Sequence, residues 1–247
     1  MNTTNITPRV ITIDGTAGSG KGTISLKLAQ ELGWHFLDSG VLYRALGLLY
    51  LWHVKQNHSK SSDSQLVNID QLDQIDLQED TLVNLAVGMQ VDFYERKILL
   101  SYKNHQIEDI TSSVRSEFAG NLASRLALFY SVRVALLDKQ REFLRPPGLI
   151  ADGRDMGTVV FPNAIIKFFL DADAKIRASR RHLQLKELGV GGNLHNRVNE
   201  LSERDLRDSQ RVVAPLKPAA DAIIIDTTTM TINEVFAIVA DQVNLIV

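Results

Sequence analysis

The sequence contains no cysteine, so disulfide frameworks and thiolate metal sites are excluded. It has no apolar run near the roughly 20 residues that span a bilayer, and residues 1–9 lack the apolar core of a signal peptide. An excess of one charge sign is also missing, because 27 Lys and Arg oppose 29 Asp and Glu. These absences predict a cytoplasmic chain that binds neither nucleic acid nor membrane.

Short apolar runs are present, and they alternate with segments of helical periodicity. Ile24, Leu28 and Leu32, for example, repeat at the spacing of one helix face. Strands that are apolar on both faces, separated by amphipathic helices, are typical of a parallel sheet covered by helices. The sequence therefore predicts an α/β fold, with strands at 10–13, 34–37, 149–151, 165–170 and 223–225.

The alternation stops between about 58 and 114, which we interpret as an inserted subdomain. Its first part holds six acidic residues and no basic residue over 63–80, a pattern typical of a solvated surface segment. Residues 89–94 and 98–103 then alternate apolar and polar side chains, and 106–110 could add a third strand. We expect a small antiparallel meander here. A long helix over about 116–144, ended by Pro146 and Pro147, should follow.

The strongest local signal is the stretch GTAGSGKGT at 15–23, between the first predicted strand and an amphipathic helix. Backbone N–H groups at such a turn, together with the positive end of the helix dipole, form an anion site. Lys21 would reach the outer phosphates of a bound nucleotide. The predicted nucleotide-binding residues are Gly15, Thr16, Ala17, Gly18, Ser19, Gly20, Lys21, Gly22 and Thr23. Gly22 stands where the usual pattern has Ser or Thr, so whether Thr23 contacts Mg²⁺ directly stays open.

Polar residues follow two of the predicted strands. Ser39 and Arg44 come after the second strand, and Arg154 and Asp155 come after the strand at 149–151. The carboxyl ends of parallel strands face the ligand crevice of a sheet, so we expect these side chains at the site. The alternative interpretation of Arg154 and Asp155 is a local ion pair.

A charged helix around 197–211 carries further candidates. Arg204, Asp208 and Arg211 share one face of it, because their spacings are four and three. A solvated helix with internal ion pairs would look the same. Phosphoryl transfer, however, needs several cations around the phosphates. The glycines at 189, 191 and 192 precede this helix and suit the hinge of a closing lid over 177–211.

Taken together, these segments resemble bacterial cytidylate kinases over nearly the whole chain. The stretches that carry the resemblance are ITIDGTAGSGKGT, LDSGVLYR, PGLIADGRDMGTVVFP, ERDLRDSQRVVAPL and ADAIIIDTT. The third and fourth are specific to that family, whereas the GKGT loop is shared by many nucleoside monophosphate kinases. Thr16 and Ala17 replace a Pro-Ser pair that is common in the family.

The resemblance implies one domain with a five-stranded parallel core, an acceptor-binding insert, and transfer of a phosphoryl group from ATP to CMP or dCMP with Mg²⁺. It assigns the acceptor phosphate to Arg44, Arg154 and Arg211, the cytosine to Ser124, Arg133 and Asp155, and the sugar to Arg204 and Asp208. Ser39 is a further substrate-binding candidate. The residues expected to act in catalysis are Lys21, Arg154, Arg180, Arg181 and Arg211, with Arg177 as a further candidate at the ATP phosphates. We expect a monomer.

Other functions remain open at this point. The nearest alternative is a sibling kinase acting on UMP, dTMP or shikimate. A slowly hydrolysing nucleotide switch is disfavoured because no guanine-binding N-K-x-D motif is found. A nucleic-acid-binding arginine helix is disfavoured by the interleaved Glu200, Glu203, Asp205 and Asp208.

Overall fold

A computed structural model describes residues 8–58, 75–94, 97–103, 108–187 and 193–247. The chain divides into two compact units. The first unit comprises Met1–Ser39 and Gln140–Val247, and the second unit is Gly40–Lys139. No helix among the described residues is long and apolar enough to cross a membrane.

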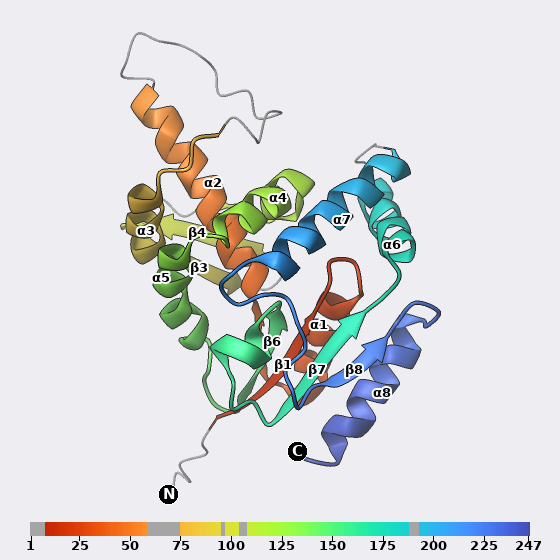
Figure 1. Ribbon diagram of the computed structural model, residues 1–247. Coiled ribbons are helices and arrows are strands. Elements are labelled where there is room, and N and C mark those ends of the chain that lie inside the picture. The colour runs from red at the N-terminus through yellow and green to blue at the C-terminus, as the bar shows by residue number, and fades with distance from the viewer. Residues whose placement is uncertain (1–7, 59–74, 95–96, 104–107, 188–192) are drawn as a thin grey trace, which may run out of the picture. The chain divides into compact units, whose positions relative to one another are not determined.

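The first unit is built on a five-stranded sheet (Figure 1). Its strands are β1 (Arg9–Gly15), β2 (His35–Asp38), β6 (Gly148–Gly153), β7 (Ile166–Asp171) and β8 (Ile223–Asp226), in the order β2-β6-β1-β7-β8. Every neighbouring pair is parallel. The predicted α/β fold is thereby confirmed, and β1, which leads into the glycine-rich loop, lies at the centre.

Helices cover this sheet. Helix α1 (Lys21–Leu32) and helix α8 (Ile232–Asn244) pack their apolar faces on it, and Ile11, Ile13 and Phe168 are fully or almost fully buried in the core between them. Helix α8 starts at a capping box in which Thr231 and Glu234 satisfy each other's backbone N–H groups. Two further helices, α6 (Ala174–Glu187) and α7 (Leu194–Gln210), pack on each other. A short π-helical turn, Met156–Val160, follows β6.

The second unit combines helices with a separate antiparallel sheet. Strands β3 (Met89–Tyr94), β4 (Lys97–Tyr102) and β5 (Glu108–Asp109) form the predicted meander in the order β3-β4-β5. Its helices are α2 (Ser39–His58), α3 (Glu79–Gly88), α4 (Glu117–Leu126) and α5 (Tyr130–Arg141), with a 3₁₀ turn at Ser113–Arg115. Helix α2 begins at the last residue of the first unit's opening segment, and α5 ends inside the first unit.

The single helix predicted over 116–144 is wrong, because residues 127–129 separate α4 from α5. The backbone hydrogen bonds show the cause. The N–H groups of Leu128 and Phe129 donate to the carbonyls of Arg125 and Leu126, which lie three residues back instead of four. Such bonds tighten the last turn of a helix and end its regular pattern of hydrogen bonds. Regular helical bonding starts again where the Arg133 N–H donates to the Phe129 carbonyl.

Two boundaries stay predictions. The sequence predicts the insert over 58–114, and residues 59–74 of it lie outside the described residues. The second compact unit extends further at both ends, from Gly40 to Lys139. The lid expected over 177–211 includes most of α6 and all of α7, but its hinge glycines also lie outside the described residues.

Candidate active site

The glycine-rich loop between β1 and α1 turns its carbonyl groups toward protein donors. The Thr16 carbonyl accepts from Ser19 Oγ at 3.0 Å, and the Ser19 carbonyl accepts from Thr227 Oγ1 at 3.0 Å. Two arginines complete the set, because Arg154 donates to the Gly15 carbonyl and Arg177 to the Ala17 carbonyl. A loop whose carbonyls are held outward in this way presents its N–H groups on its other side, which is the arrangement that binds phosphate.

The start of this loop leaves no space for a side chain. A Cβ atom on Gly15, whose φ is +148°, would lie 1.9 Å from the Leu170 carbonyl oxygen of β7. Only glycine therefore lets β1 turn into the loop while staying paired with β7. The next strand residue back, Asp14, accepts the N–H groups of Met156 and Gly157, both at 2.8 Å. Burial raises the pKa of Asp14 to about 7.

Lys21, the first residue of α1, lies beside a carboxylate at the end of β6. Its Nζ is 3.8 Å from Asp152 Oδ1. Burial lowers the pKa of Lys21 to about 8, against the opposing effect of the Asp152 charge. The second oxygen of Asp152 would be 3.2 Å from a Cβ on Gly22. A carboxylate therefore lies close to the position where the usual loop pattern has a hydroxyl side chain.

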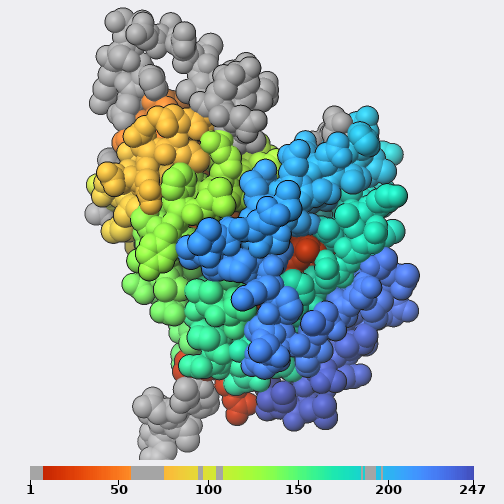
Figure 2. Space-filling model, viewed as in Figure 1, coloured from red at the N-terminus to blue at the C-terminus, as the bar shows by residue number. Residues whose placement is uncertain are grey.

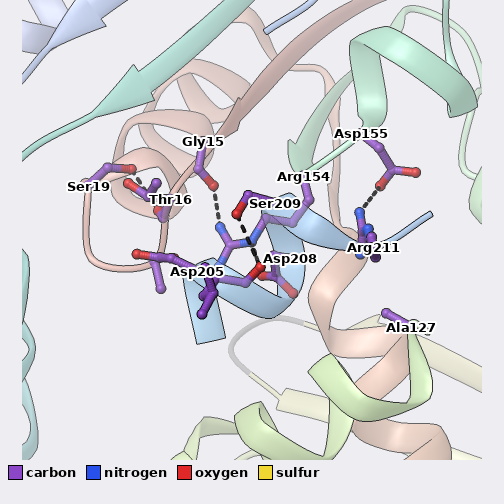
Figure 3. Close-up of polar contacts among 12 residues, drawn as sticks. Gly15, Thr16, Ser19, Ala127, Arg154, Asp155, Asp205, Asp208, Ser209 and Arg211 are labelled. Carbon is purple, nitrogen blue, oxygen red and sulfur yellow. Dashed lines mark hydrogen bonds and ion pairs between the residues drawn. The ribbon is translucent and has the colours of Figure 1, made fainter. Parts of the chain in front are cut away.

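Arg154 links the end of β6 to both the loop and α7. Its guanidinium bonds the Gly15 carbonyl and pairs with Asp208 Oδ2 at 2.9 Å (Figure 3). Both side chains of the pair are largely buried. Burial would raise the pKa of Asp208, but the charges of Arg154, Arg204 and Arg211 outweigh it and hold that pKa below its usual value. Asp208 is therefore a carboxylate at neutral pH.

Asp155 and Arg211 face each other on the same side of the first unit (Figure 3). Arg211 Nη2 is 3.8 Å from Asp155 Oδ1, and Arg211 Nε donates to the Ala214 carbonyl. Ser39 is buried, and its hydroxyl accepts from Gln140 Nε2 at 2.7 Å. The first unit thus brings together the candidates from β6 and α7, and Ser39 follows β2, the strand paired with β6.

A pocket of about 350 Å³ opens beside the loop in the first unit. Gly18, Ser19 and Gly20 line one side of it, and the apolar side chains of Leu183, Met230 and Ile232 line another part. The lining comes from the loop, α1, α6, the turn after β8 and the start of α8. Figure 2 shows red atoms from the first part of the chain in a hollow between light-blue and teal residues.

Arg180, predicted to act in catalysis, is part of this pocket. Its guanidinium donates to the hydroxyl and carbonyl of Thr227, at 3.0 and 2.6 Å, and to the Met230 carbonyl at 3.1 Å. Here it secures the turn after β8 that forms the pocket wall. Arg181 is its half-buried neighbour on α6. Arg177 is buried and directed to protein groups.

The remaining candidates belong to the second unit. Arg44 of α2 donates to the Val114 carbonyl at 2.9 Å. Arg133 of α5 lies over the ring of Tyr43, 5.8 Å from its centroid, and approaches the Ala127 carbonyl at 3.5 Å. Ser124 is buried in α4. Three different helices of this unit therefore supply the three side chains.

Sequence reasoning missed several residues of this site. Asp152 had no assigned role, although its alignment with Ile13 across the two strands places it next to the loop. Asp14, Thr227 and Met230 were also missed. Their contacts join positions far apart in the chain, such as Ser19 and Thr227, and no local pattern signals them.

Comparison with known proteins gives matches over nearly the whole chain. The family model described as cytidylate kinase matches residues 11–245. The cytidylate kinase of Aeromonas salmonicida is 48% identical over 93% of this chain and 91% of its own length. That of Photorhabdus laumondii is 49% identical over 92% and 91%. A solved structure from Eubacterium ventriosum aligns over 96% of this chain and 98% of its own, with 12% identity and a TM-score of 0.42. The resemblance seen in the sequence is confirmed, and the chain belongs to the cytidylate kinase family.

Proposed function

We propose that this chain transfers the γ-phosphoryl group of ATP to CMP or dCMP, giving ADP and CDP or dCDP. The observation that carries the proposal is membership of the cytidylate kinase family over residues 11–245. The loop with outward carbonyls supports the donor half of the reaction, since it suits a polyphosphate. The substrates are small molecules of the cell interior, and we propose that the enzyme acts there as a cytoplasmic monomer.

ATP would lie with its phosphates on the loop and its base in the adjoining pocket. The pocket size and its apolar lining by Leu183, Met230 and Ile232 suit an aromatic base. Lys21 would pair with the outer phosphates, and Arg181 is placed on the same helix as the pocket residues Arg180 and Leu183. Arg180 would shape the pocket through its bonds to the turn at Thr227.

The donor set next to the loop fits Mg²⁺, which prefers hard oxygen ligands. Asp152 carries a carboxylate beside Lys21, close to the space that a side chain at position 22 would occupy. Thr23 is exposed and lines the pocket. Asp152, with Thr23 as a second oxygen, would hold the ion together with the nucleotide phosphates. Mg²⁺ would neutralise charge that develops on the transferred phosphoryl group.

On the acceptor side, Arg154 and Arg211 would hold the CMP phosphate, joined by Arg44 of the second unit. Asp155, with Ser124 and Arg133, would read the cytosine, and Ser39 would add a hydroxyl contact. Arg204 and Asp208 would meet the sugar. The proposed step is attack of an acceptor phosphate oxygen on the γ-phosphorus while the bond to the β–γ bridging oxygen breaks. That attacking oxygen is already anionic, so positioning and charge neutralisation supply most of the catalysis.

The specificity for cytosine should depend on Asp155. A carboxylate accepts from the exocyclic amino group of cytosine but opposes the carbonyl of uracil. We expect Asp155→Ala to lower kcat/KM for CMP about tenfold to a hundredfold more than for UMP. The measurement is kcat/KM for CMP, dCMP, UMP and dTMP in both proteins. Wild type that prefers UMP or dTMP would contradict the proposed function itself.

The same experiment separates two roles of Asp155. Its carboxylate lies 3.8 Å from the guanidinium of Arg211. If Asp155 only holds that arginine for the phosphate, every acceptor loses equally and the ratio of CMP to UMP stays at the wild-type value. If Asp155 recognises the base, the ratio of kcat/KM for CMP to kcat/KM for UMP should be smaller in Asp155→Ala than in the wild type.

Donor affinity should depend on pH through Lys21. The pKa of Lys21 is lowered to about 8 in the ligand-free protein, and bound phosphate raises it again. Affinity is therefore greatest below about pH 8, and it falls above that value toward a limit of about tenfold per pH unit. Calorimetric titration with ADP and Mg²⁺ between about pH 7.5 and 9.5 measures the fall, since phosphate groups with a pKa near 6 are almost fully ionised over this range.

The control for this titration is Lys21→Arg, because arginine stays charged throughout the range. The ADP affinity of Lys21→Arg should not change with pH over this range, even if it differs from that of the wild type. An equal decline in both proteins would mean that another group titrates.

A further inference from the structure

Arg177, near the start of α6, joins three separate parts of the first unit. Its Nε donates to the Ala172 carbonyl at 2.7 Å and its Nη1 to the loop carbonyl of Ala17 at 3.0 Å. The same Nη1 pairs with Asp205 of α7. The arginine is only 5% exposed, so these contacts are shielded from solvent and strong for their type. One guanidinium thus connects the phosphate loop to both helices of the predicted lid.

The backbones of the phosphate loop and α6 also lie close together beside Arg177. A Cβ on Gly18, whose φ is +79°, would lie 2.9 Å from the Arg177 carbonyl oxygen. Ala17 is buried in a small apolar cluster with Ala178 of α6 and Leu201 of α7. The loop, α6 and α7 therefore share a local core around the arginine.

Asp205 and Asp208 make parallel links from α7 to the loop. Asp208 pairs with Arg154, which bonds the Gly15 carbonyl. Asp205 pairs with Arg177, which bonds the Ala17 carbonyl. The two aspartates are three residues apart and so lie on one face of the helix. Asp208 belongs to the acceptor site proposed above, whereas Asp205 has no role there.

We propose that Arg177 and Asp205 are positioning residues that couple the phosphate loop to α7, so that a bound donor sets Asp208 and Arg211 for the acceptor. Donor phosphates order the loop, and Arg177 holds the Ala17 carbonyl away from them. Because Arg177 also pairs with Asp205, an ordered loop would fix the position of α7 one turn before Asp208. The proposal rests on the proposed function, because it assumes ATP on the loop and CMP beside α7.

The coupling is measurable as the effect of the donor on CMP affinity. We expect a nonhydrolysable ATP analogue with Mg²⁺ to tighten CMP binding at least about fivefold in the wild type, within the usual range for coupled sites. In Asp205→Ala the factor should fall to less than about twofold. In Asp205→Asn, which keeps a neutral acceptor for Arg177, it should be intermediate. Isothermal titration of CMP, with and without the saturating analogue, gives each factor, and a melting curve checks each fold.

Asp221→Ala is the matched control. Asp221 also pairs with a buried cation, Lys167 of β7, at 2.9 Å in the same unit, and neither residue lines the nucleotide pocket. In Asp221→Ala the ATP analogue should tighten CMP binding by the same factor as in the wild type. If Asp205→Ala fails to fold, Asp205→Asn decides, since Arg177 there keeps all three acceptors.

Two results would overturn the coupling role. One is a wild-type CMP affinity that does not respond to the analogue, and the other is a wild-type factor retained in the folded Asp205 variants. A wild-type protein that neither binds nor phosphorylates CMP would instead contradict the proposed function, so the two failures are distinguishable.

Discussion

Lys21→Ala should lose most of its activity and keep its fold. The ammonium group is proposed to pair with the outer phosphates, and removing one such stabilising group from a transferring centre costs about a hundredfold to a thousandfold in kcat. The fold should survive because the contact of Lys21 with Asp152 is long, at 3.8 Å, and because burial disfavours the ammonium charge and lowers its pKa to about 8. A coupled kinase assay and a melting curve on the same sample measure both effects.

Lys27→Ala is the control for this experiment. Lys27 lies on the same helix, donates to Asn233 at 3.3 Å and lies over the Phe236 ring, and it does not line the nucleotide pocket. Its turnover should match the wild type. A well-folded Lys21→Ala protein with near-native turnover would contradict the assignment of the phosphate loop.

Arg154→Met should lose both activity and stability. Its partner Asp208 is a carboxylate with a side chain only 5% exposed. Removing one member of a buried pair leaves the other without full compensation and typically costs about 3–5 kcal/mol in the free energy of unfolding. The Gly15 carbonyl loses its donor as well. The lost contact to the acceptor phosphate should lower kcat/KM about a hundredfold or more. Urea unfolding and steady-state kinetics give the two quantities.

The double variant Arg154→Met/Asp208→Asn separates these losses. Neutralising the stranded carboxylate should recover part of the stability but none of the activity. Arg154→Met with wild-type stability would show that Arg204 and Arg211 alone are enough to compensate Asp208.

The predictable part of this structure is the part that local patterns determine. Short apolar runs located all five parallel strands, because strands of a sheet covered by helices are buried on both faces. The spacing of Ile24, Leu28 and Leu32 located α1. The glycines around Lys21 located the loop, because its geometry requires residues without side chains, most clearly at Gly15.

The helix break at 127–129 was missed because the spacing of the buried apolar residues continues across it. Leu122 and Leu136 are 14 residues apart, which is about four helical turns, so their spacing alone looks like that of one long helix. The partners of Arg177 and Arg180 were missed for another reason. An arginine-rich stretch indicates positive charge, but only the fold determines that Arg177 meets Asp205 and that Arg180 meets Thr227.

The chain passes between its two compact units at only two points, Ser39 to Gly40 and Lys139 to Gln140. Gln140 donates to the Ser39 hydroxyl at 2.7 Å, so both crossings leave the first unit at one place. A segment, Gly40–Lys139, that starts and ends at neighbouring positions closes its loop within the host with little dependence on its length. A change in the length of the second unit, including at the acidic stretch near 63–80, should therefore leave the register of the five strands that carry the phosphate loop unchanged.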